Sequence, residues 1–195
     1  MRAWIFRCVV LMAAFSLARG DVARAQSRGG ANPSELMGAL KVGQWVKLEG
    51  PAGGTPTVMC TEAKMLAGDF LDDDWEISGN VRRVDPAKGT LTVFTLSARL
   101  GQDARFKGSS EAFRSLAQVR NGMYINLEGT FLKDGSFIAK KVSERSEELA
   151  KKPQHLGRVW VKGRIDRVNP GSRTVTVMGI PFVITAQTRV KSVIR

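Results

Sequence analysis

The sequence has few of the side chains on which enzymes and metal sites depend. Its 195 residues include one histidine, two cysteines and one tyrosine. The histidine, His155, is far in sequence from either cysteine, which excludes a zinc or copper site with several His or Cys ligands. Neither a Gly-x-Ser-x-Gly nucleophile motif nor a phosphate-binding loop occurs. We therefore predict a protein that is not an enzyme, with no metal and no cofactor; catalysis would have to use carboxylates such as Asp85 and Glu128.

The N-terminus is typical of a secretory signal peptide. Arg2 and Arg7 form a positive start before an apolar run over residues 8–18, and Ala23-Arg24-Ala25 is a small-x-small cleavage site, with cleavage after Ala18 as the alternative. The run is about half of the ~20 residues that a membrane-spanning helix needs. We predict a signal peptide over 1–25, a flexible segment over 26–33, no transmembrane anchor after cleavage, and a periplasmic or secreted protein.

Removal of the signal peptide would leave Cys60 without an intramolecular partner, so disulfides would not hold the fold. Cys60 is then either a reactive thiol or a small buried residue on a strand, and free cysteines are commonly buried.

Positive charge is concentrated at the C-terminus. The formal net charge is +12, and residues 151–195 hold ten basic side chains against a single acidic one, Asp166. Such a surface either attracts an anionic polymer, such as an anionic glycan, lipid headgroups or nucleic acid, or keeps an exported protein soluble.

The sequence also repeats itself. Residues 77–94 align with 161–178 at an offset of 84, and residues 43–50 align with 122–129 at an offset of 79. Thus 75–144 holds a whole unit, whereas 34–66 resembles its second half and 159–195 its first half. A fixed internal period indicates repeated structural units.

The whole unit has the pattern of a small β-barrel. Alternating apolar residues and turn signals predict strands over 75–84, 90–96, part of 98–106, 123–131 and 136–142, with a helix over 110–119 before the last two. Three strands, a helix and two strands is the order of the OB-fold, a small partly open barrel.

The pattern Gly79-x-Val81-x-x-Val84-Asp85, followed by Leu127-x-Gly129, resembles a domain of unknown function that is widespread in exported bacterial proteins. The resemblance implies a fold and names no catalytic residues, because its motifs are glycines and strand valines.

The two outer halves together contain every element of a unit. We therefore predict an all-β fold with short helices and two OB-fold-like five-stranded barrels: a contiguous barrel over 75–144, and a circularly permuted barrel split between 34–66 and 159–195. Residues 145–158 are the linker. Isolated half-barrels would expose unpaired edges. The alternatives are a monomer and a domain-swapped dimer, in which each half finds its complement in a second copy.

The function that we predict is a non-catalytic exported binding or assembly module of unknown ligand in the envelope. The alternative is a polyanion-binding protein that uses the basic C-terminal half. Partners would be an anionic polymer or another envelope protein. We expect the ligand face of the barrels on their second and third strands, and surface aromatics either as stacking platforms or as packing between barrels. The face residues are Thr92, Phe94, Arg173, Thr176, Met178 and Arg189, and the aromatics are Trp45, Tyr124 and Trp160.

Overall fold

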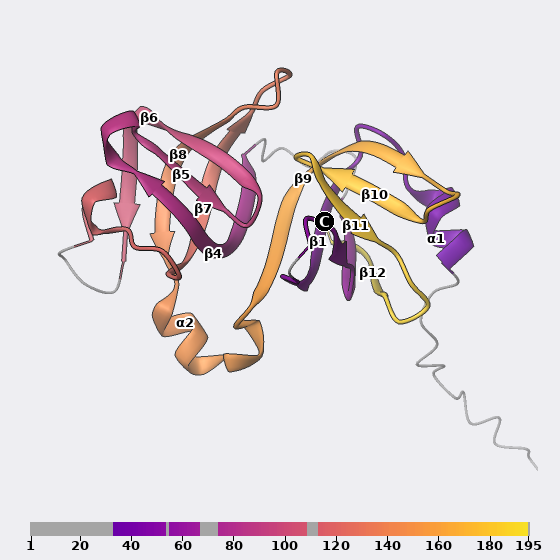
Figure 1. Cartoon of the computed structure of the whole chain (residues 1–195). Coiled ribbons are helices and arrows are strands. Elements are labelled where there is room, and N and C mark those ends of the chain that lie inside the picture. Colours follow the sequence, from indigo (N-terminus) through magenta and orange to yellow (C-terminus); the bar gives the residue numbers. More distant parts are fainter. Residues whose placement is uncertain (1–32, 54, 67–73, 109–112, 195) are drawn as a thin grey trace, which may run out of the picture.

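The computed structural model describes residues 33–194, except 54, 67–73 and 109–112 (Figure 1). The predicted signal peptide and residues 26–32 of the predicted flexible segment lie outside the described residues. The prediction of an all-β fold with short helices is confirmed. The elements are α1 (Pro33–Ala39), β1 (Trp45–Pro51), β2 (Val58–Met59), β3 (Glu62–Leu66), β4 (Trp75–Asp85), β5 (Thr90–Val93), β6 (Leu96–Lys107), β7 (Tyr124–Phe131), β8 (Phe137–Glu144), α2 (Ser146–Lys151), β9 (Arg158–Asn169), β10 (Thr174–Val177), β11 (Ile180–Val183) and β12 (Arg189–Ile194), with short 3-10 turns at Pro86–Lys88, Leu116–Gln118 and Pro153–His155.

Strands β4 to β8 close into a five-stranded barrel. β4 pairs with β5 and with β7, β6 pairs with β5 through residues 96–99 and with β8 between residues 98 and 107, and β7 pairs with β8. Every second residue points inward, so that Ile77, Leu91, Leu127 and Phe137 are almost fully buried. We call this the contiguous barrel.

The remaining strands come from both ends of the chain and pair with one another. β1 lies between β3 and β9, β12 pairs with β3, and β10 joins β9 to β11, which pairs with β2. The predicted halves 34–66 and 159–195 are therefore neighbours within one chain (Figure 1). We call β1, β2, β3, β9, β10, β11 and β12 the split unit.

Several strand pairs of the split unit recur in the contiguous barrel at the offsets seen in the sequence. Phe182 pairs with Val58 in parallel register, as Ala98 pairs with Phe137. The glycines in the turns before β1 and β7 also correspond. Gly43 at φ +83° and Gly122 at φ +86° both adopt a left-handed backbone that favours glycine. The offsets of the sequence repeat therefore relate residues that occupy equivalent positions in paired strands.

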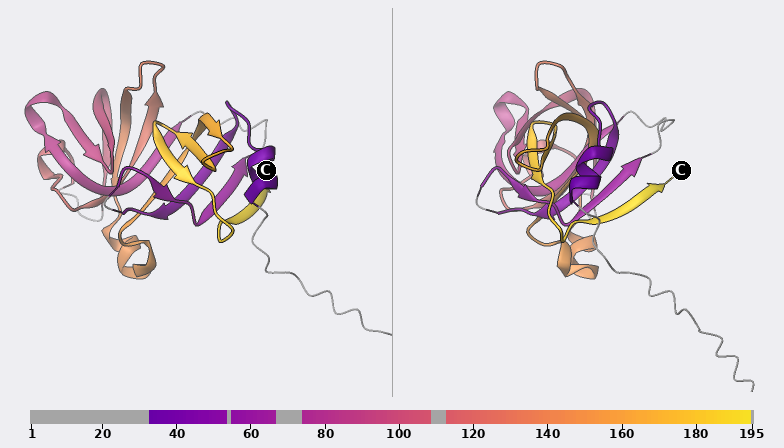
Figure 2. Two further views of the ribbon diagram at one scale, coloured as in Figure 1. Left: turned by 45° about the vertical axis from the view of Figure 1, so that its right-hand side comes forward. Right: turned by 90° about the vertical axis from the view of Figure 1, so that its right-hand side faces the viewer.

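The two units share one sheet through their first strands. β4 and β9 pair antiparallel, with Ile77 opposite Val161, which are themselves equivalent positions of the repeat. The pairing places the units side by side in approximate two-fold relation, with α2 and the rest of the linker projecting from one side (Figure 2).

The predicted helix over 110–119 differs from the structure. Among its described residues only Leu116–Gln118 form a single 3-10 turn, and 110–112 lie outside the described residues. The buried side chains Phe113, Leu116 and Val119 explain the helical spacing, because they meet the same core without a full helix.

Within the part of the chain that the structure describes, none of the helices has the length and apolar character needed to cross a membrane.

Candidate anion-binding groove

Four lysines line up on the outer face of the shared sheet. Lys162 on β9 lies opposite Lys47 on β1, Lys47 opposite Lys64 on β3, and Lys64 opposite Lys191 on β12. Neighbouring strands are ~4.8 Å apart, so the row spans about 14 Å. Like charges directly opposite one another destabilise a sheet, and an arrangement of this kind favours an anionic ligand. We call Lys162, Lys47, Lys64 and Lys191 the lysine row.

Carboxylates neutralise the ends of the lysine row. Lys162 Nζ lies 2.5 Å from Glu76 Oε1 of the contiguous barrel, at a side-chain exposure of 9%. Glu62 accepts from Lys64 at 3.2 Å and from Lys191 at 3.0 Å. Burial opposes ionisation of Glu62, but the hydrogen bonds from these two lysines hold its pKa below the ordinary value.

Lys47 lies at the centre of the row. Among the described residues Lys47 forms no ion pair, and its Nζ lies 3.8 Å from the ring centroid of Trp160. Burial, and then the charge of Lys64, lower the pKa of Lys47. An anion placed beside Lys47 would relieve this repulsion.

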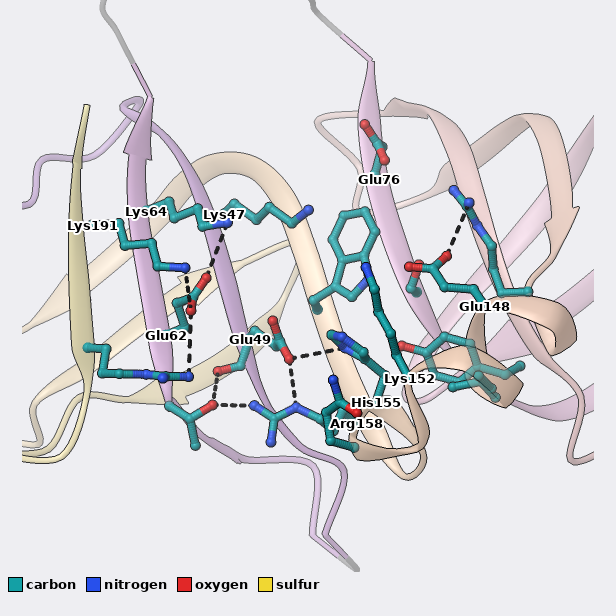
Figure 3. A pocket seen from close by; sticks show the side chains of 18 of the residues that line it. Lys47, Glu49, Glu62, Lys64, Glu76, Glu148, Lys152, His155, Arg158 and Lys191 are labelled. Carbon is teal, nitrogen blue, oxygen red and sulfur yellow. Dashed lines mark hydrogen bonds and ion pairs between the residues drawn. The ribbon is translucent and has the colours of Figure 1, made fainter. Parts of the chain in front are cut away.

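A groove of about 950 Å³ runs over this face and is walled by the linker (Figure 3). This volume is at the upper end of the ~300–1,000 Å³ of ligand-binding pockets. On the linker side, Glu49 accepts a hydrogen bond from Arg158 Nε at 2.6 Å and lies 3.6 Å from His155 Nδ1. His155, which the sequence places in a linker, therefore contacts β1 and helps to hold the linker against the groove.

Tyr124 contributes a hydroxyl that the protein leaves unused. The residue lines the groove and is 5% exposed, and its Oη has no hydrogen-bond partner among the described residues. Burial raises the pKa of Tyr124 to about 12, so the hydroxyl remains protonated at neutral pH. A buried donor without an acceptor costs about 1–3 kcal/mol, which a ligand acceptor could recover.

Beside Tyr124, a polar network covers the outer face of the contiguous barrel. Ser78 Oγ donates to Asn126 Oδ1 at 2.8 Å, Asn126 Nδ2 donates to Glu128 at 3.1 Å, and Glu128 accepts from Lys141 Nζ at 2.8 Å. These contacts satisfy the side chains of Asn126 and Glu128, so this end of the face offers less free charge than the lysine row.

The predicted surface aromatics are mostly buried. Trp45 is 7% exposed because its ring packs 5.3 Å from that of Trp75, which lies 5.3 Å from Phe131. The interpretation of Trp45 and Tyr124 as exposed stacking platforms is therefore wrong, and Trp45 instead packs the split unit against the contiguous barrel. Trp160 is half-buried and lines the groove, but Lys47 covers its ring.

The structure does not bring the predicted ligand face together. Phe94 and Met178 are core residues, 5% and 2% exposed, in equivalent tight turns at φ +53° and +51°, so that part of the prediction is wrong. Thr92 and Thr176 are half-buried on β5 and β10, and Arg173 is exposed in the turn before β10. Of the six predicted residues only Arg189, on β12, lines the groove.

The two carboxylates that could have served catalysis have structural contacts and lie apart. Asp85 ends β4 and accepts from Lys88 N at 3.2 Å, capping a 3-10 turn. Glu128 lies opposite Glu76, near the start of β4, and binds Lys141. Within the described residues no group of His, Cys, Asp and Glu is arranged to hold a metal ion.

Cys60 is a buried residue between β2 and β3, and its Sγ donates to the carbonyl of Glu62 at 3.3 Å. Burial raises the pKa of the Cys60 thiol to about 12. The thiol is therefore protonated at neutral pH, which argues against a reactive role.

Sequence reasoning missed the lysine row because its members are far apart in the chain. Charge alone pointed to the C-terminal half, yet Lys47 and Lys64 come from the N-terminal half. The repeat offsets were the one sequence signal that could have placed these lysines opposite one another, had they been used to transfer strand pairing from one unit to the other.

The chain was compared with solved structures, curated proteins and family models. The chain is similar to the fimbrial biogenesis protein PilY2 of Pseudomonas aeruginosa PAO1, at 20% identity over 42% of this chain and 94% of that chain, with a TM-score of 0.32. No curated protein matches the sequence. A family model described as a domain of unknown function (DUF5666) matches residues 78–143 and 162–194, half of the chain. The two matched segments are the contiguous barrel and the C-terminal part of the split unit, and the chain belongs to this DUF5666 family.

Proposed function

We propose that this protein is a non-catalytic exported binding protein that holds an anionic ligand in the groove between its two units. The observation that carries the proposal is the lysine row, in which four lysines stand in register on adjacent strands and three of them, Lys47, Lys64 and Lys191, line the groove. This proposal differs from the sequence-based alternative, in which the basic C-terminal half alone binds the polyanion. Two of the four lysines of the row, Lys47 and Lys64, come from the N-terminal half of the chain.

The proposed architecture is a pair of related barrels. We infer that the split unit is a circularly permuted copy of the contiguous barrel, since its strand pairs repeat at the same offsets. This architecture supports the binding proposal because the groove lies where the two units meet, and such junctions commonly hold ligands.

Export to the periplasm or the medium is part of the proposal. Its support is the signal-peptide layout of residues 1–25. Mass spectrometry of the protein from the producing cell checks it: a mature chain that begins at residue 19 or 26 is expected, and an intact N-terminus on all molecules would contradict export.

A double variant tests the binding proposal. Replacing Lys47 and Lys191 by glutamine should weaken binding to linear polyanions at least about tenfold at low salt and flatten the dependence of affinity on salt. Binding is measured by titration calorimetry with three probes, an oligogalacturonate, an oligothymidylate and poly-L-glutamate, over a salt series.

The matched control removes the same charge away from the groove. Lys88 and Lys133 do not line it, so their double replacement by glutamine should change affinity less than about threefold. Failure of all three probes to bind the unaltered protein at low salt, or equal losses in both double variants, would contradict the proposal.

A further inference from the structure

We infer that the ligand of the groove is an acidic polysaccharide, with its carboxylates on the lysine row and a sugar oxygen accepting a hydrogen bond from Tyr124 Oη. This inference rests on the proposed function and adds the chemical class of the ligand. Three features of the groove carry it: interleaved charges, the lack of free stacking surfaces, and the unused hydroxyl.

The charges of the groove alternate between rows. The row next to the lysine row holds Ser78, Trp160, Glu49, Glu62 and Arg189 on successive strands. Rows on one face are separated by two residues, or about 6.8 Å. A ligand seated on the lysines therefore presents its flank to Glu49, which is paired with Arg158, and to Glu62, which is paired with Lys64 and Lys191.

The side of the ligand that faces Glu49 and Glu62 must donate hydrogen bonds to these carboxylates rather than carry further negative charge. A nucleic acid has a phosphate at every nucleotide and would compete with these two carboxylates for the cations that neutralise them. An acidic polysaccharide carries hydroxyl groups between its carboxylates, and a hydroxyl can donate to a glutamate or accept from Arg158. The lysines suit this ligand as point charges that do not demand the planar, bidentate geometry that arginine favours.

Apolar contacts are scarce in the groove. Leu149 is the one aliphatic side chain among the described residues that line it, which disfavours a lipid tail or an apolar peptide. The ring of Trp160 is covered by Lys47 at 3.8 Å, so bases do not find an open aromatic platform.

Tyr124 then acts as the specificity residue. Tyr124 lines the groove, its Oη has no acceptor among the described residues, and the residue is 95% buried, so the donor is held in a fixed position before the ligand binds. Non-specific attraction between charges does not depend on this hydroxyl. A contribution of the Tyr124 hydroxyl to the binding affinity would therefore indicate a glycan bound in a defined orientation.

The test compares probes of equal charge on the full protein and on Tyr124→Phe. We expect an oligogalacturonate of about ten sugars to bind at least about tenfold more tightly than an oligothymidylate or a poly-L-glutamate of the same charge, and a carboxyl-reduced oligogalacturonate not to bind. Tyr124→Phe should weaken oligogalacturonate binding about threefold to tenfold and leave oligothymidylate binding unchanged.

The variant loses only an oxygen that makes no described hydrogen bond, so its melting temperature should be unchanged or raised. Equal affinity for the equally charged probes, or unchanged oligogalacturonate binding by Tyr124→Phe, would overturn the inference while leaving polyanion binding in place. Preferential binding of the oligothymidylate would overturn it in favour of a nucleic acid. Loss of the proposed function itself would appear instead as the absence of binding to every probe.

Discussion

Replacing Gly129 by alanine is expected to lower the free energy of unfolding by about 3 kcal/mol or more. Gly129 is buried on β7 at a β-bulge, where the register with β8 shifts between Glu128 and Gly129. A Cβ at this position would overlap the backbone carbonyl oxygen of Ile138 on β8. A backbone atom of a paired strand cannot move aside as a side chain does, so the strand pair itself must separate.

The repeat extends this prediction to the split unit. Gly50 is the equivalent of Gly129, and a Cβ there would overlap the carbonyl oxygen of Met59, which is the equivalent of Ile138. Gly50→Ala should therefore destabilise the protein by a similar amount. For a chain of this size, 3 kcal/mol corresponds to a fall in melting temperature of about 6–12 °C.

Urea and thermal unfolding followed by circular dichroism measure the effect. Gly38→Ala is the matched control, because Gly38 lies in α1 with open space around its Cβ position and should be neutral or slightly stabilising. A loss below about 1 kcal/mol for Gly129→Ala would show that the bulge can open to admit a methyl group, contrary to the close packing seen here.

The second large effect is expected at the junction of the two units. Glu76→Gln should lower the free energy of unfolding by about 2–3 kcal/mol, because it removes the carboxylate 2.5 Å from the buried ammonium of Lys162. The pair joins β4 of the contiguous barrel to β9 of the split unit, at opposing positions of the shared sheet. The carboxylate is 20% exposed, so the loss should fall somewhat below the ~3–5 kcal/mol found when a fully buried pair is broken.

Two further variants separate the ion pair from other causes. Replacing both partners with apolar residues, Glu76→Leu with Lys162→Met, should restore most of the stability, since a buried charge is then no longer present. Lys140→Gln removes a lysine from a pair of 2.8 Å whose partners are 56% and 40% exposed, and should cost less than about 1 kcal/mol. Equal losses in Glu76→Gln and Lys140→Gln, measured by urea unfolding, would contradict a special role for the buried pair.

The same variant links stability to binding. Glu76 neutralises one end of the lysine row, so Glu76→Gln should bind polyanions more tightly than the unaltered protein although it is less stable. Opposite signs for stability and affinity would indicate that the like charges of the row are retained for a ligand rather than for the fold.

The sequence by itself determined the strands of the contiguous barrel, their order and the repeat that relates the two ends of the chain. Alternating side chains and the Asp85–Gly89 turn place β4 and β5, and the offsets of 84 and 79 relate residues that occupy the same register in both units. These features are local or periodic, and the period-2 pattern of a strand translates directly into inward and outward faces.

Only the tertiary structure decided what the outward faces do. Tyr124 was expected as a surface aromatic, but it is 5% exposed and lies beside linker residues in the wall of the groove. Lys47, Lys64, Lys162 and Lys191 become neighbours because four strands from opposite ends of the chain pair in one register. Strand pairing over such sequence distances depends on closing the sheet, and alternation within one strand contains no information about its partner.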